Sequence, residues 1–179
     1  NPAIGNIDAD PELEVVAQGE GKYLVAFEHD GTPKWKSNNF NGTEGSGSVA
    51  IANLDGQGDP ELIYGAAVYS SAGMKVWEGA NGIGYDLQGP ISCIADLDGD
   101  LRPEVIGGRT AYKTTGTVAG GDFTGMVYWT AAPGDGKCGV ADFDADGLAE
   151  VILVRGGTIY ALDGQTGATI DSIPIPGTT

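Results

Sequence analysis

The chain has 179 residues, of which 31 are glycine and only nine are lysine or arginine, and its formal net charge is -16. A single all-β domain of this length can bury a sizeable core, and scattered glycines are typical of tight turns between short strands. So few basic residues, in no patch, argue against nucleic acid as a partner. No apolar run approaches the ~18 residues that a membrane-spanning helix needs.

Acidic residues recur at fixed spacing, most clearly in the middle of the chain. Asp96, Asp98, Asp100 and Glu104 stand at positions 1, 3, 5 and 9 of a short segment, with Gly99 where the chain must turn. At an effective dielectric of ~20, two unit charges ~5 Å apart repel by roughly 3 kcal/mol. The segment therefore requires a positive charge. Ca²⁺, which accepts six to eight oxygen ligands in flexible geometry, fits it better than Mg²⁺.

The acidic segment differs from an EF-hand, whose bidentate glutamate stands at position 12 of a loop between two helices. Here the glutamate comes at position 9. Short apolar runs at 91–95 and 105–106 flank the segment and have the length of strands. These features predict a metal-binding loop that joins two strands of a hairpin.

The same pattern occurs four times, in segments that we call loops 1 to 4. They begin at residues 6, 53, 96 and 142, which gives periods of 47, 43 and 46 residues. Repeats of this length with several short strands are typical of β-propeller blades. We predict an all-β protein in which residues 1–179 form a single β-propeller region of four four-stranded antiparallel blades. The expected blades cover approximately 1–40, 48–80, 90–131 and 137–175.

A glycine turn precedes the expected last strand of every repeat. Four residues after these glycines stand three tryptophans and one aspartate. A residue type that recurs at one phase of a repeat favours packing between blades over an exposed sugar-stacking platform. The glycines are Gly31, Gly73, Gly125 and Gly167, and the residues that follow them are Trp35, Trp77, Trp129 and Asp171.

The connections vary more than the strands. The third repeat carries an insertion, Thr115 to Thr124, which we expect on the same face as the acidic loops. The connections between repeats are expected on the opposite face, where Phe40 and Tyr85 are candidates to contact a partner. Solvated linkers are the alternative interpretation of these connections.

The sequence offers no catalytic constellation. The single histidine, His29, has no second histidine with which to form a zinc site or an acid–base pair, and no serine or cysteine nucleophile motif is present. We therefore expect that the protein is not an enzyme. Cys93 and Cys138 stand 45 residues apart, nearly one repeat, on the inner strands of neighbouring blades. Because they are offset by one residue in phase, two buried thiols are expected rather than a disulfide.

The run Asp-x-Asp-Gly-Asp-x-x-Pro-Glu-Val, repeated with apolar flanks, resembles the FG-GAP/VCBS repeats of integrin α-subunit heads and of many secreted bacterial proteins. The resemblance covers essentially the whole chain. It implies a β-propeller with one Ca²⁺ in each hairpin loop, up to four in all, in an extracellular protein that serves in adhesion, in ligand binding or as an accessory domain of carbohydrate-active enzymes.

The resemblance also implies the metal ligands. Loops 3 and 4 match the family pattern fully, with the carbonyl at position 7 included, whereas loop 1 has an asparagine at position 1 and Pro11 after position 5. Loop 2 has amides at positions 1 and 5, and we expect the weakest affinity there. The expected metal-site residues are Asn6, Asp8, Asp10, Glu12, Glu14, Asn53, Asp55, Gln57, Asp59, Glu61, Asp96, Asp98, Asp100, Arg102, Glu104, Asp142, Asp144, Asp146, Leu148 and Glu150.

Four blades are few for a propeller. The chain is expected to be a segment of a larger propeller, to form a homodimer with eight blades, or to close as a compact ring of four. The function expected is a calcium-stabilised extracellular scaffold that binds a protein or glycan. The alternative is an accessory or catalytic domain of a polysaccharide-degrading enzyme.

Overall fold

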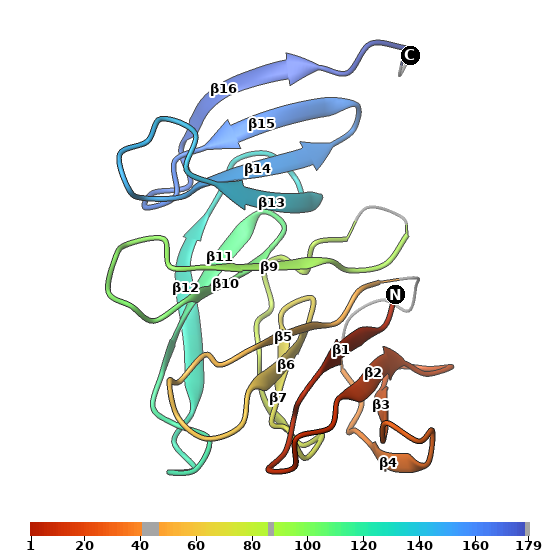
Figure 1. The fold of residues 1–179 in the computed structure, drawn as a ribbon. Helices are drawn as coiled ribbons and strands as arrows, with labels where there is room; N and C mark the ends of the chain where they lie inside the picture. The colour runs from red at the N-terminus through yellow and green to blue at the C-terminus, as the bar shows by residue number, and fades with distance from the viewer. Residues whose placement is uncertain (41–46, 86–87, 178–179) are drawn as a thin grey trace.

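The computed structural model describes residues 1–40, 47–85 and 88–177, and their regular structure is entirely β. Four four-stranded antiparallel sheets, which we call sheets 1 to 4, follow one another along the chain (Figure 1). Their strands are β1 (Ala3–Gly5), β2 (Glu14–Gln18), β3 (Leu24–Phe27) and β4 (Pro33–Lys36); β5 (Ala50–Ala52), β6 (Glu61–Tyr64), β7 (Ala67–Tyr69) and β8 (Lys75–Glu78); β9 (Ser92–Ala95), β10 (Glu104–Gly107), β11 (Thr110–Thr115) and β12 (Thr124–Thr130); β13 (Lys137–Ala141), β14 (Glu150–Arg155), β15 (Thr158–Leu162) and β16 (Thr169–Pro174).

Each sheet is a meander, since its strands pair in sequence order. The acidic loops join the first strand of each sheet to the second, as the sequence predicts for a hairpin. The first strands of successive sheets contact one another, β1 with β5, β5 with β9, and β9 with β13. The fold of the described residues is therefore a row of four similar sheets with their first strands on the inside (Figure 1). None of the described segments is a helix long and apolar enough to cross a membrane.

The third and fourth strands of every sheet share one irregularity. The register shifts between Ala26 and Phe27, and the corresponding shift occurs in each of the other three sheets. An extra residue at such a point bends the strand and increases its twist. The repeat in the sequence is thus a repeat of backbone geometry as well as of composition.

Three apolar clusters form the core, one between each pair of neighbouring sheets. The residue at position 2 of an acidic loop belongs to each cluster, as Ile7, Leu54 and Leu97, all of which are at most 1% exposed. Alternate residues of the second and third strands complete the packing, because side chains on one face of a strand recur every two residues. The acidic loops are thereby fixed to the interfaces between sheets.

The repeated tryptophans pack across these interfaces. Trp35 of sheet 1 lies against Gly73 of sheet 2, where a Cβ atom would come within 2.6 Å of the indole ring. The same contact joins Trp77 to Gly125 and Trp129 to Gly167. The indole N–H of Trp129 also donates to the carbonyl of Gly164 at 2.7 Å. The prediction that these side chains pack between repeats is confirmed.

The prediction of two free thiols is wrong. Cys93 in β9 and Cys138 in β13 form a disulfide, with their Cα atoms 6.1 Å apart. Because the first strands of sheets 3 and 4 contact each other, an offset of one residue still leaves the Cα atoms within the ~7 Å that a disulfide allows. The bond ties sheet 4 to sheet 3.

Candidate metal sites

All four acidic loops share one anchor, the glutamate at position 9. In every loop its Oε2 atom accepts the backbone N–H of position 2, at 2.7 to 2.8 Å. Glu14, Glu61 and Glu104 are at most 2% exposed, and Glu150 is half-buried. Since the glutamate begins the second strand of its sheet, this bond holds one carboxylate over the loop at the same place in each repeat.

The loop backbone folds around the side chains at positions 1, 3 and 5. The N–H of position 5 donates to Oδ1 of the position-3 aspartate in all four loops. In loops 1, 3 and 4, the N–H of position 7 donates to Oδ1 of position 5. Short polar side chains that accept bonds from the backbone two residues later are typical of tight turns. The turns leave the second oxygens of the aspartates at positions 3 and 5 for other partners.

Three of the loops bring carboxylates close enough to share a cation. Oxygens of three residues lie within 4.8 Å of one another in each of loops 1, 3 and 4. Loop 2 has no such group among the described residues, and it has the amides of Asn53 and Gln57 at positions 1 and 5, where loops 3 and 4 have aspartates. The groups are Asp8, Glu14 and Glu28; Asp96, Asp98 and Glu104; and Asp142, Asp144 and Asp146.

One observation indicates that the residues of loop 1 fit a hard cation. Glu14 is fully buried, yet its Oε1 atom has no hydrogen-bond partner. A buried charged oxygen without a partner is costly, and a cation that takes oxygen ligands would supply what is missing. Glu28, which follows β3, adds a carboxylate from outside the predicted loop. The repeat pattern gives no signal for this residue.

Two lysines reach into the loops, which the sequence analysis did not anticipate. Lys34 of β4 pairs with Asp8, and with Glu28 at 2.8 Å. Lys113 of β11 pairs with Asp98, and lies 3.7 Å from Asp100. These ammonium groups provide part of the positive charge that loops 1 and 3 require. The hydrogen bond from Lys34 lowers the pKa of Asp8, and the bond to Asp98 raises the pKa of Lys113.

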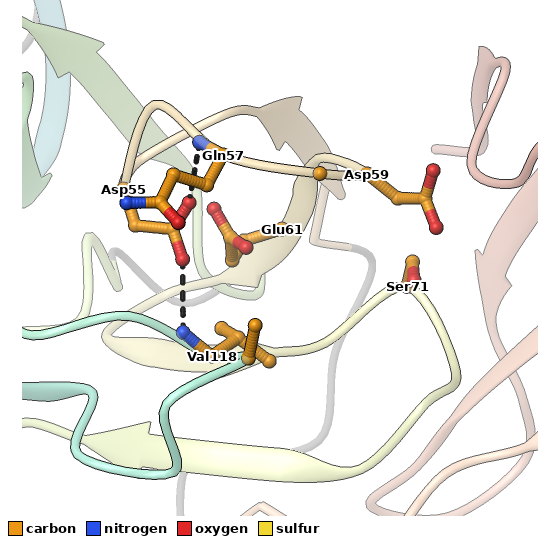
Figure 2. Close-up of a pocket in the computed structure, with 8 residues that line it drawn as sticks. Asp55, Gln57, Asp59, Glu61, Ser71 and Val118 are labelled. Atoms are coloured by element: carbon orange, nitrogen blue, oxygen red, sulfur yellow. Dashed lines mark hydrogen bonds between the residues drawn. The ribbon is translucent and has the colours of Figure 1, made fainter.

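Loop 2 is covered by the insertion of the third repeat. The N–H of Val118 donates to Oδ2 of Asp55 at 2.9 Å (Figure 2). The prediction that the insertion and the acidic loops share one face is confirmed by this contact. A cavity of about 210 Å³ remains beside it, lined by loop 2, by Ser71 of the turn after β7 and by the insertion. Figure 2 shows the side chain of Asp59 turned away from Asp55 at the far end of the loop.

In the described residues, loop 4 has neither a paired lysine, as loops 1 and 3 have, nor an insertion above it, as loop 2 has. The described residues place no donor from outside the loop on Asp144, the counterpart of Asp8, Asp55 and Asp98 at position 3. Asp142, Asp144 and Asp146 are all exposed. Phe143, at position 2, is 62% exposed, whereas its counterparts are buried. Loop 4 therefore holds three close carboxylates with which no lysine or arginine in the described part of the chain pairs.

Burial affects the position-9 glutamates in the central sheets. It raises the pKa of Glu104 to about 7, against the opposing effect of the N–H donated by Leu97. Burial also raises the pKa of Glu61. A carboxylate in an apolar surrounding is destabilised unless opposite charge lies nearby. The Lys113 ammonium offsets part of the rise in the pKa of Glu104.

The residues at position 7 have no common side-chain role. Glu12 and Asp59 are exposed, Leu148 is half-buried, and the Arg102 guanidinium donates to Thr114 and to the carbonyl of Gly116. What they share is the loop backbone, so a role for these residues in binding a metal stays a prediction that concerns their carbonyl oxygens.

The expected partner surface on the opposite face is partly wrong. Phe40 is only 3% exposed and its ring lies 4.8 Å from that of Tyr64, in the core between sheets 1 and 2. Sequence analysis missed this because the residue follows the last strand of its sheet, in a segment that looks like a linker. Tyr85 is half-buried.

Comparison with known proteins gives a likeness of fold. No family model matches the chain, and no curated protein sequence does. The structure is similar to part of the crystal structure of the V. cholerae biofilm matrix protein Bap1, with a TM-score of 0.71 and 22% sequence identity. The match covers 97% of this chain but only 28% of Bap1. The chain therefore has the fold of a region of that longer protein.

Proposed function

We propose that the chain is a calcium-stabilised β-propeller region of the FG-GAP/VCBS type, and that it serves as an extracellular scaffold for adhesion or binding. The sheets are its four blades, and loops 1, 3 and 4 are its stronger calcium sites. Asp96, Asp98, Asp100 and Glu104 would hold the ion in loop 3, and the equivalent residues in the other loops. The bound ion would neutralise carboxylates that otherwise repel one another.

The observation that carries this proposal is the buried Oε1 atom of Glu14, which lacks a partner in a residue that lies close to two further carboxylates. The same anchor, from position 2 to position 9, in all four loops extends the argument to the other repeats. The Cys93–Cys138 disulfide supports an extracellular location, because disulfides persist in oxidising compartments. The likeness of fold to a region of a biofilm matrix protein agrees with an adhesive role.

Thermal unfolding with Ca²⁺, with Mg²⁺ and with a chelator tests the proposal. A ligand that binds only the folded chain stabilises it by about 2.7 kcal/mol per site at a hundredfold excess over Kd. We expect the midpoint to rise with Ca²⁺ more than with Mg²⁺. Glu14→Gln should reduce the rise, while the exposed Glu20→Gln, a matched control outside the loops, should leave it unchanged. Equal midpoints in all three conditions would contradict the proposal.

The alternative, a domain of a polysaccharide-degrading enzyme, is tested separately. Incubation with a panel of acidic and neutral polysaccharides would be followed by assays for new reducing ends and unsaturated sugars. The proposed scaffold would bind a polysaccharide without cleaving it. Cleavage that continues after calcium has been removed would favour the alternative.

A further inference from the structure

In three of the four acidic loops, the same oxygen receives a donor from outside the loop. That atom is Oδ2 of the position-3 aspartate, whose Oδ1 accepts the N–H of position 5. The donor is the Lys34 ammonium in loop 1, the N–H of Val118 in loop 2 and the Lys113 ammonium in loop 3. The described residues place no such donor on Asp144 in loop 4. The loops therefore differ at one oxygen that the turns leave for other partners.

The two lysines occupy different positions of their repeats. Lys34 lies in β4, the fourth strand of sheet 1, whereas Lys113 lies in β11, the third strand of sheet 3. Both nevertheless reach the position-3 aspartate of the loop beside them. Two unrelated positions thus deliver one positive charge to the same atom, which indicates that a cation is favoured at this place in the loop.

Lys113 is held by several groups. Its ammonium pairs with Asp98, lies 3.7 Å from Oδ2 of Asp100, and lies 4.6 Å from the centroid of the Tyr128 ring. A lysine over the face of an aromatic ring gains a further attraction. Asp98 is also one of the three carboxylates that lie within 4.8 Å of one another in loop 3. The ammonium therefore already uses one carboxylate of the group that would hold the ion.

Lys34 neutralises loop 1 only in part. It pairs with Asp8, and with Glu28 at 2.8 Å, and both belong to the carboxylate group of that loop. The third member of the group, Glu14, keeps a buried Oε1 atom without a hydrogen-bond partner. One ammonium thus leaves a charged oxygen for which an ion with more ligands could compensate.

We propose that Lys34 and Lys113 are exchangeable counter-ions of loops 1 and 3, and that calcium binds there by displacing their ammonium groups from the position-3 aspartate. The inference rests on the proposed function, because it concerns the same ion. An ammonium and Ca²⁺ on one carboxylate repel each other. Ca²⁺ carries two charges and takes six to eight oxygens, so it compensates more of the carboxylates than one ammonium does. The ion would therefore replace the lysine, and the released ammonium would enter solvent.

The exchange gives different affinities to loops with the same ligand residues. Loops 3 and 4 both have aspartate at positions 1, 3 and 5 and glutamate at position 9. Only loop 3 has a lysine to release among the described residues. Loop 4 should therefore bind calcium first, and loop 3 should keep its fold better in chelator.

NMR of the chain during a calcium titration tests the displacement directly. The Nζ and Cε signals of Lys113 should move toward those of a solvated lysine over the same calcium range in which the amides of loop 3 shift. The signals of Lys137, which pairs with no carboxylate in the described part of the chain, should stay in place. Lys113 signals that do not change while the amides of loop 3 shift would overturn the proposal and leave the proposed function standing.

Removing the lysine tests the competition. Lys113→Met should raise the calcium affinity of loop 3, read from its amides, by about two- to fivefold, which corresponds to the usual strength of a lysine–carboxylate pair near the surface. Lys34→Met should act in the same way on loop 1. Lys137→Met removes the same charge outside the loops, so this matched control should leave both affinities unchanged.

Thermal unfolding separates the two roles of Lys113. In chelator, Lys113→Met should lower the midpoint, because the carboxylates of loop 3 lose their counter-ion, and calcium should restore it. A calcium affinity that is unchanged or lower in Lys113→Met would overturn the exchange alone. Loop amides of the parent chain that do not respond to calcium at all would overturn the exchange together with the proposed function.

Discussion

Loops 2 and 4 share the backbone hydrogen bonds donated at positions 2 and 5, yet in the described residues only loop 2 of this pair is supported by contacts from another part of the protein. In loop 2 an insertion from sheet 3 donates an N–H to Asp55, Leu54 is buried, and two amides replace carboxylates. In loop 4 the acids are exposed, and Asp144 receives no donor from outside its loop among the described residues. Loop 2 is stabilised by contacts within the protein. Under the proposed function, loop 4 would depend on a bound ion instead.

The largest effect should come from the disulfide that holds the sheet of loop 4. Replacing Cys93 and Cys138 with serine should lower the free energy of unfolding by about 2 to 5 kcal/mol, the usual cost of losing a native disulfide. Denaturant melts with and without Ca²⁺ would measure the change. If loop 4 depends on the ion, the loss should be greater in chelator. An equal loss in both conditions would weaken the comparison.

Substitutions of the position-9 glutamates should give the next largest difference in stability between loops 2 and 4. Glu61→Ala leaves the buried N–H of Leu54 without an acceptor and should cost about 1 to 3 kcal/mol, with or without Ca²⁺. Glu150→Ala removes the same bond from a more exposed loop, so in chelator it should cost less than Glu61→Ala. In Ca²⁺, Glu150→Ala should cost more than it does in chelator. Chemical unfolding of both variants would check the order, which the reverse pattern would contradict.

The position-3 aspartates provide a finer test. Asp55→Ala removes the acceptor for Val118 and should cost about 1 kcal/mol even in chelator, the usual net contribution of one hydrogen bond. Asp144→Ala should have no effect in chelator, and should lower the midpoint only when Ca²⁺ is present. Hydrogen exchange at Val118 would report the loosened insertion in the first variant. Protection there that is the same as in the parent would count against the anchoring role of Asp55.

The last prediction concerns pH without calcium. Burial raises the pKa of Glu104 to about 7, so the folded chain retains a proton that the unfolded chain loses near the usual value of 4.5. Folding then takes up a proton, and the stability should fall as pH rises between these values and level off above them. Melts from pH 4.5 to 8 in chelator should show the fall, Glu104→Gln should remove it, and Ca²⁺ should offset it. A stability that rises over this range would contradict the assignment.

The sequence alone predicts the repeated architecture because the period and the apolar alternation are local signals. The four sheets lie within the residue ranges expected for the blades, and the three tryptophans pack between sheets as their shared phase indicates. The contacts around Asp8 and Asp98 could not be predicted in this way. Lys34 and Lys113 come from different strands of their repeats, and no spacing in the chain relates them to the loops.

Other misses have the same physical origin. The disulfide depends on how closely β9 and β13 approach, which spacing along the chain does not determine. Phe40 is buried because a segment outside the strands folds back onto Tyr64. The hydrogen bond from Val118 to Asp55 joins residues 63 positions apart, so the composition of the insertion does not predict it.

The most direct test of the central claim is the number of calcium ions bound per chain, measured by titration calorimetry after complete chelation. We predict at least three ions, with loop 2 the weakest site if it binds at all. Removing the acids of loop 4 through Asp142→Ala with Asp144→Ala should lower the number by one, while Glu20→Gln should leave it unchanged. A folded chain that takes up no calcium would contradict the account.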